Sequence, residues 1–126
     1  MPETVSYNQV DKIVEVRSSG HLTILELTTS KEGVERLFSE NEVNGIFIDV
    51  RDARSMPTSF SLVDSVEATF QSTISQETKF ALLMTQTEGE VVREMRLVEI
   101  AGRHRGMPFR LFDDEEKARQ WLLDSQ

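Results

Sequence analysis

Cysteine is absent from the 126-residue sequence, so disulfides, thiolate zinc sites and iron–sulfur clusters are excluded. No apolar run approaches the roughly 20 residues that a membrane-spanning helix requires. The first residues, MPETVSYNQVDK, lack both the basic start and the apolar core of a secretory signal. We therefore expect a cytoplasmic protein without an integral membrane segment.

Basic residues are also few. The sequence has 14 Lys and Arg against 22 Asp and Glu, a formal net charge of -8. That charge repels phosphate backbones and anionic bilayers, so neither nucleic acid nor a membrane surface is an expected partner. Its simplest role is solubility. A chain of this length favours one domain, 1–126, and can bury a core without disulfides or metals.

The N-terminal part of the sequence predicts a β-hairpin. Residues 9–17 (QVDKIVEVR) and 22–28 (LTILELT) have the apolar content and alternation of strands. Between them, SSGH at 18–21 is a turn signal. Residues 1–8 are expected to be frayed.

Helices and strands are then expected to alternate. In order, the expected elements are a helix with a Thr29–Glu32 capping box ending near Asn44-Gly45, a strand at 46–50, a helix at Ser59–Ile74, a strand at 79–85, a helix at 89–104, a strand at 109–112 and a helix capped by Asp113. The order β-β-α-β-α-β-α-β-α predicts an α/β fold. We expect a single domain with a mixed, mostly parallel sheet of about five strands, covered by amphipathic helices. Trp121 is expected to anchor the last helix in the core.

Three segments resemble a known family. The closing segment AGRHRGMPFRLFDDEEKARQWLL (101–123) is similar to the end of SpoIIAA-like proteins, and FIDVRDA (47–53) followed by PTSF (57–60) is similar to their central strand and loop. These proteins are a branch of the STAS fold, which includes anti-sigma-factor antagonists and sulfate-transporter tails. Some bacterial members are compared with CRAL-TRIO lipid-binding domains. The resemblance implies a cytoplasmic, non-enzymatic bacterial module that binds a small apolar ligand or a partner protein.

The polar segment after the central strand is the first candidate site. Ligands of open α/β sheets bind at the carboxyl ends of the strands. A ligand- or partner-facing loop is therefore expected at Arg51, Asp52, Arg54, Met56 and Phe60. The alternative is a plain connector whose opposite charges pair with each other. Asp49 interrupts an apolar strand, and we expect it to be buried and paired rather than catalytic.

The start of the Ser59–Ile74 helix is a second candidate. In phosphorylated members of the STAS fold a serine at this position accepts phosphate, which would here implicate Thr58, Ser59 and Ser61. Those members have an acidic-Ser-Ser-Gly motif, whereas this sequence has MPTSFS. The alternative is that Thr58 or Ser59 is simply the N-cap.

Two further sets of residues are candidates for contact with a ligand or partner. An apolar groove or a homodimer contact would be lined by Leu62, Val66, Phe70, Leu97 and Ile100, which are otherwise core residues. An anion contact would use Arg103, His104, Arg105 and Arg110, which otherwise complement a helix dipole and pair with nearby acids. His21 is expected in a solvated turn. No catalytic set, cofactor or metal site is predicted.

Overall fold

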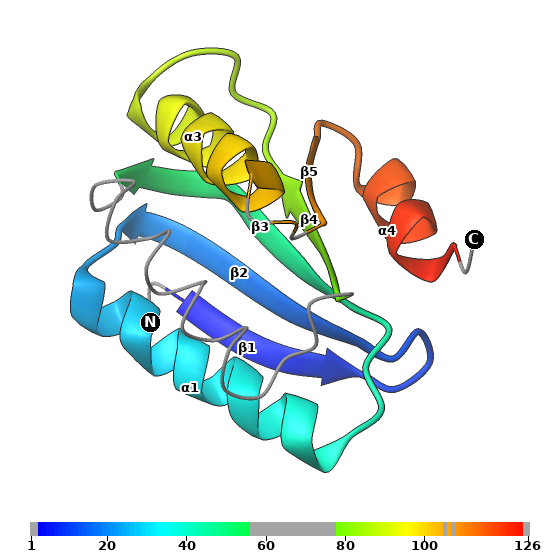
Figure 1. Cartoon of the computed structure of the whole chain (residues 1–126). Helices are drawn as coiled ribbons and strands as arrows, with labels where there is room; N and C mark the ends of the chain where they lie inside the picture. The colour runs from blue at the N-terminus through cyan, green and yellow to red at the C-terminus, as the bar shows by residue number, and fades with distance from the viewer. Residues whose placement is uncertain (1–2, 56–77, 105, 107, 125–126) are drawn as a thin grey trace.

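A five-stranded sheet lies at the centre of the computed structural model, with the strand order β1-β2-β3-β4-β5 (Figure 1). The structure describes residues 3–55, 78–104, 106 and 108–124. The strands are β1 (Glu3–Asn8), β2 (Ile13–His21), β3 (Gly45–Ser55), β4 (Lys79–Leu83) and β5 (Phe109–Phe112). β1 is antiparallel to β2 and every other neighbouring pair is parallel. The predicted α/β fold with a mixed, mostly parallel sheet is confirmed.

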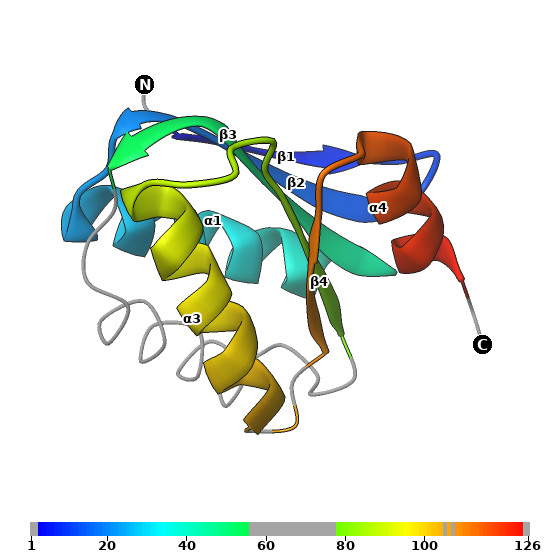
Figure 2. The same ribbon diagram turned by 90° about the horizontal axis from the view of Figure 1, so that it is seen from above.

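The described helices cover both faces of this sheet. They are α1 (Ile24–Glu40), α3 (Glu90–His104) and α4 (Glu115–Leu123). The helix expected at Ser59–Ile74 lies outside the described residues. Figure 2 shows α3 and α4 on opposite sides of β4. None of the helices in the described ranges is long and apolar enough to cross a membrane.

Alternating side chains of the strands form two separate cores. Val14, Ile46 and Leu82 pack with α1 and α3, on what we term the α1/α3 face. Ile13, Phe47 and Leu83 pack with α4, on the α4 face. Because both faces of the central strands are covered, nearly every position of their sequence is apolar, which is why these strands could be predicted. α4 packs closely enough that a Cβ at Gly45 would lie 2.7 Å from Leu122 Cδ2.

The strands of the N-terminal hairpin were predicted at the wrong positions in the sequence. Residues 3–8 form β1 and are not frayed, and β2 continues through 18–21, where a turn was expected. The turn lies instead at 9–12, where Lys12 has a φ of 58° and the Asn8 side chain accepts hydrogen bonds from the next backbone amides. An asparagine of this kind provides the turn without glycine.

Residues 22–28 begin a helix rather than forming a strand. Thr23 is the N-cap of α1, and its capping box with Glu26 replaces the one expected at Thr29 and Glu32. The Thr29 hydroxyl donates to the Leu25 carbonyl inside the helix. Ile24 and Leu25 are exposed, so the apolar residues of this turn do not mark a buried face. α1 ends at Glu40, a few residues earlier than expected.

The last helix differs from its prediction in two details. Its N-cap is Asp114, which accepts from the Lys117 amide at 3.1 Å, rather than Asp113. Ala118 and Leu122 are its buried residues, whereas Trp121 is only half-buried. The Trp121 ring packs at the edge of the core against Phe112, with 5.6 Å between ring centroids. The expectation of Trp121 as a core anchor is therefore corrected: it covers the core edge.

Candidate functional site

The carboxyl end of β3 is a strand, where a loop was expected. Arg51, Asp52 and Arg54 belong to β3, which runs to Ser55. β3 extends beyond Leu83, the last residue of β4, which pairs with Asp49. These three residues lie at the carboxyl ends of the strands, which is the position predicted from sequence. Their local structure differs from the prediction, because they belong to a strand with a fixed backbone and not to a loop.

A β-bulge orients these residues. Arg17 pairs with Asp49 and Ser19 with Asp52, so β3 advances by three residues while β2 advances by two. Ala53 is buried in the core of the α1/α3 face. Because side chains alternate along a strand, the extra residue places both the Arg51 and the Asp52 side chains on the α4 face.

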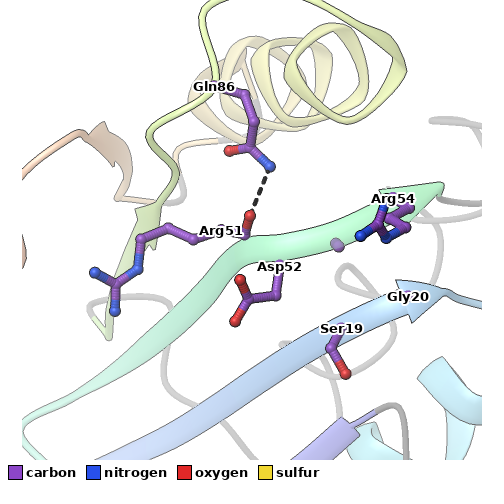
Figure 3. Close-up of a pocket in the computed structure, with 7 residues that line it drawn as sticks. Ser19, Gly20, Arg51, Asp52, Arg54 and Gln86 are labelled. Atoms are coloured by element: carbon purple, nitrogen blue, oxygen red, sulfur yellow. Dashed lines mark hydrogen bonds between the residues drawn. The ribbon is translucent and has the colours of Figure 1, made fainter.

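The side chains of Asp49 and Gln86 satisfy the backbone of the bulge. Asp49 Oδ1 accepts from the Arg51 amide at 3.0 Å. The Gln86 side-chain amide donates to the Arg51 carbonyl at 3.0 Å (Figure 3). It also donates to the Val50 carbonyl at 3.3 Å. Buried or half-buried backbone groups need such partners where a ladder ends. The end of β3 is thus held in one conformation.

Beside the bulge lies a hollow of about 590 Å³, which we term the polar hollow. It is lined by Ser19, Gly20, Arg51, Asp52, Ala53, Arg54 and Gln86. In Figure 3 the Asp52 carboxylate points toward β2, and the Arg51 side chain extends away from Ser19 and Arg54. Asp52 and Arg54 are exposed, and neither side chain forms a hydrogen bond or ion pair with the described part of the chain. A carboxylate and a guanidinium are thus available to a partner.

His21 and Ser55 close the same end of the sheet. His21 Nδ1 lies 2.8 Å from Ser55 Oγ, and the two residues are paired across β2 and β3. The Leu22 amide donates to the Ser55 carbonyl at 3.0 Å. His21 was expected in a turn, and it is instead the last residue of β2. Its exposure agrees with the expected solvation.

Next to the polar hollow, and sharing Arg51 with it, three acids and three arginines alternate in a closed ring, which we term the ion-pair ring. Its contacts, in order, are Glu15–Arg17 (3.2 Å), Arg17–Asp49 (2.8 Å), Asp49–Arg51 (2.7 Å), Arg51–Glu115 (3.2 Å), Glu115–Arg119 (3.0 Å) and Arg119–Glu15 (2.9 Å). β2, β3 and α4 each contribute two members. The guanidinium carbons of Arg119 and Arg17 lie 4.7 and 5.9 Å from the ring centroid of Phe47. The ring therefore attaches α4 to the sheet.

The ring determines the ionisation of its buried acids. Burial alone would raise the pKa of Asp49, but hydrogen bonds and charge from Arg51, together with the charge of Arg17, lower that pKa below its ordinary value. Burial likewise opposes the ionisation of Glu15, whose pKa is lowered by Arg119, Asn8 and Arg17. Asp49 is 7% exposed and paired with Arg17 and Arg51, so the expectation that it is buried and paired is confirmed.

The other predicted site residues fall in different places. Outside the described residues lie Met56, Thr58, Ser59, Phe60, Ser61, Leu62, Val66, Phe70 and Arg105. Leu97 and Ile100 are exposed on α3 rather than buried. Arg103 and His104 are exposed at the end of α3, whereas Arg110 lies on β5 with its guanidinium carbon 5.3 Å from the Phe112 ring centroid. Phe112 belongs to the core of the α4 face, so the sheet separates Arg110 from Arg103 and His104.

Sequence reasoning missed Ser19, Gly20 and Gln86. The first two were assigned to a turn, and the mistaken hairpin concealed their pairing with Asp52 and Ala53. Gln86 follows a predicted strand, and its polar side chain directly after an apolar run was the available signal. Within the described ranges, no group of three or more His, Cys, Asp or Glu could hold a metal ion.

Comparisons with known proteins are informative at the level of structure. No family model matches the sequence, and no curated protein is similar to it. An anti-sigma factor antagonist from Mycobacterium paratuberculosis superposes with a TM-score of 0.66 at 16% identity, over 97% of this chain and 93% of that one. An uncharacterised DUF3478 protein with a SpoIIAA-like fold from Shewanella loihica gives a TM-score of 0.59 at 17% identity, over 95% and 91%. The chain therefore has the SpoIIAA-like fold that its sequence predicted.

Proposed function

We propose that this chain is a non-enzymatic protein-interaction module whose partner is an anti-sigma factor, bound at the polar hollow. The observation behind the proposal is that Asp52 and Arg54, two exposed and opposite charges, stand on a backbone held by Gln86 and Asp49. A backbone that is already fixed avoids the cost of ordering a loop on binding, and the charges on it select a partner by complementarity. The similarity to the structure described as an anti-sigma factor antagonist supports the type of partner.

The chemistry of the hollow favours a protein partner over an apolar ligand. Its lining residues are mostly polar or charged, and a site for a lipid-like molecule would be lined mostly by apolar side chains. The apolar ligand and its groove therefore stay a prediction from sequence. Phosphorylation at Thr58, Ser59 or Ser61 also stays a prediction, and the proposed docking does not depend on it.

The hydrogen bond between His21 and Ser55 does not lead to an enzymatic alternative. Activation of a serine needs a base that is oriented through its second ring nitrogen, and donors for the developing oxyanion. The contact is on Nδ1, and within the described part of the chain the His21 side chain has no other hydrogen bond. We assign this pair to the closure of β2 on β3.

Calorimetric titration against the anti-sigma factors encoded in the same genome would test the proposal. Asp52→Arg and Arg54→Glu should each weaken binding at least tenfold, about 1.4 kcal/mol. Matched reversals at the far end of α1, Glu40→Arg and Arg36→Glu, change the same charges on exposed side chains and should leave the affinity unchanged. The proposal fails if no anti-sigma factor binds at micromolar concentration, or if the reversals at the hollow have no effect.

A further inference from the structure

The solvent-facing side of α3 has an unusual composition. Apart from Glu90 at its first position, the exposed side chains of α3 form what we term the α3 stripe: Arg93, Arg96, Leu97, Ile100, Arg103 and His104. At 100° per residue these six positions lie within an arc of about 120°. The two apolar side chains are 48% and 54% exposed and are adjacent in the middle of the stripe. The exposed acid Glu90 lies about 20° outside this arc, next to Leu97, so the stripe itself is basic and apolar in a chain with a net charge of -8.

The opposite side of α3 is firmly packed, so the stripe cannot turn inward. Val91, Met95 and Val98 are buried in the core of the α1/α3 face. Gly102 lies so close to the sheet that a Cβ there would be 3.1 Å from the Phe109 ring. The helix therefore presents the stripe to solvent as a fixed surface.

The acidic neighbours of the stripe neutralise little of its charge. Glu99 accepts from the Leu111 amide at 2.8 Å and reaches Arg103 only at 3.9 Å. Arg93, Arg96 and His104 form no side-chain hydrogen bond or ion pair with any described residue. Arg103 also donates from Nε to the Phe109 carbonyl at 3.4 Å. Three arginines with one long ion pair among them, around two exposed aliphatic side chains, match an acidic surface that also contains apolar residues.

We propose that the α3 stripe docks an acidic, amphipathic segment of a partner protein. This surface is distinct from the polar hollow, whose side chains Ser19 and Asp52 belong to the α4 face of the sheet. The inference therefore goes beyond the proposed function and does not depend on it. Leu97 and Ile100 would fill apolar positions of the segment, and the arginines would pair with its carboxylates.

Two other occupants fit the stripe less well. A symmetric dimer through α3 would place each stripe against its copy, with arginines facing arginines. An anionic bilayer would repel a chain of net charge -8, and two aliphatic side chains bury little area in lipid. Charge complementarity therefore favours a different, acidic protein.

Photo-crosslinking in cells of the native organism tests the proposal. Ile100 is replaced by p-benzoylphenylalanine, and adducts are identified by mass spectrometry. The expected adduct joins position 100 to a different protein through a peptide with an excess of Asp and Glu. Its yield should fall at least tenfold with Arg93→Glu and Arg96→Glu combined, and stay unchanged with Arg36→Glu. The same probe replacing Leu123, an exposed leucine of α4, should not give that adduct.

Several results would overturn the proposal: no adduct, an adduct between two copies of this chain, or a yield that survives the charge reversal. Co-sedimentation with vesicles of 30% phosphatidylserine tests the alternative that the stripe binds a membrane. Binding to these vesicles that disappears with Arg93→Glu and Arg96→Glu would assign the stripe to lipid. Asp52→Arg should leave the yield of the adduct unchanged while it lowers the affinity for the anti-sigma factor. Failure of one proposal is therefore distinguishable from failure of the other. Thermal unfolding of each variant confirms that it is folded.

Discussion

The side chain of Gln86 hydrogen-bonds the backbone of Arg51 two residues beyond the point where β4 stops pairing with β3. A side chain thus takes the role of a neighbouring strand. It also bonds the Val50 carbonyl, so one amide satisfies two acceptors that β4 leaves unpaired. The geometry of the proposed docking surface at the polar hollow depends on this contact.

Gln86→Ala should lower the free energy of unfolding by about 1–3 kcal/mol, because two backbone acceptors lose their donor. Urea denaturation measures this. Gln120→Ala removes the same side chain from an exposed position of α4 and should cost less than about 0.5 kcal/mol. Equal effects of the two substitutions would contradict the role assigned to Gln86.

Asp49→Asn should destabilise the protein more at pH 7 than at pH 3. The folded state lowers the pKa of Asp49, so its contribution is present above the ordinary pKa of about 4 and is lost as the pH falls through the folded pKa. At pH 7 we expect a loss of about 1–3 kcal/mol, since Arg17 and Arg51 lose their shared carboxylate. Denaturation at both pH values gives the comparison, with Asp113→Asn as the exposed control. A loss independent of pH would contradict it.

Glu3→Gln should have the opposite pH dependence. Burial raises the pKa of Glu3 even though Ser18 and Ser30 both donate to its carboxylate. A raised carboxyl pKa means that stability is lost as the pH rises from the unfolded to the folded pKa. The variant should therefore gain stability relative to the native chain between pH 4 and pH 7. Glu40→Gln, at an exposed site, should show no such trend. If the stability of Glu3→Gln relative to the native chain fell as the pH rose, the raised pKa of Glu3 would be refuted.

Arg119→Ala should release α4 from the sheet. Arg119 pairs with Glu15 and Glu115 and stacks over Phe47, and its loss leaves the buried Glu15 with fewer donors. Amide exchange of α4 should accelerate at least tenfold relative to β3. Arg119→Lys should recover only part of the protection, because lysine cannot bond two carboxylates in one plane. Lys117→Ala is the exposed control, and uniform exchange across the chain would show that α4 does not open separately.

Thr23→Ala should cost about 1 kcal/mol of unfolding free energy, the usual effect of losing an N-cap. Thr29→Ala, at the position where the sequence alone predicted the cap, should cost less, because its hydroxyl bonds only a helical carbonyl. Thermal or urea unfolding of the pair decides between the two positions. A larger loss of unfolding free energy for Thr29→Ala than for Thr23→Ala would support the capping box predicted from sequence at Thr29 and Glu32.

The sequence predicted the parallel strands well because both of their faces are buried. Ile46 and Phe47 are covered from opposite sides, and such continuous apolar runs have few other interpretations. The start of α1 was misassigned because Ile24 and Leu25 are exposed, so their spacing does not follow a buried face. In that segment the Thr23–Glu26 capping box was the better signal.

Sequence named part of the proposed site, and the geometry of these residues was not foreseeable. Arg51, Asp52 and Arg54 were identified because they follow a buried strand. The bulge that orients them depends on a pairing with Ser19, in a stretch that resembled a turn, and on a hydrogen bond from Gln86, 35 residues away in sequence. Local patterns do not contain contacts of that separation.

The ion-pair ring joins residues that are synthesised far apart in time. Arg119 meets Glu15 across 104 positions of sequence, and Arg51 meets Glu115 across 64. While the chain leaves the ribosome, Glu15, Arg17, Asp49 and Arg51 are available long before α4 exists. The nascent sheet therefore exposes Phe47 and an open row of charges until the last helix emerges. Docking of α4 must come late, and a chaperone would find its binding surface on the α4 face of the unfinished protein.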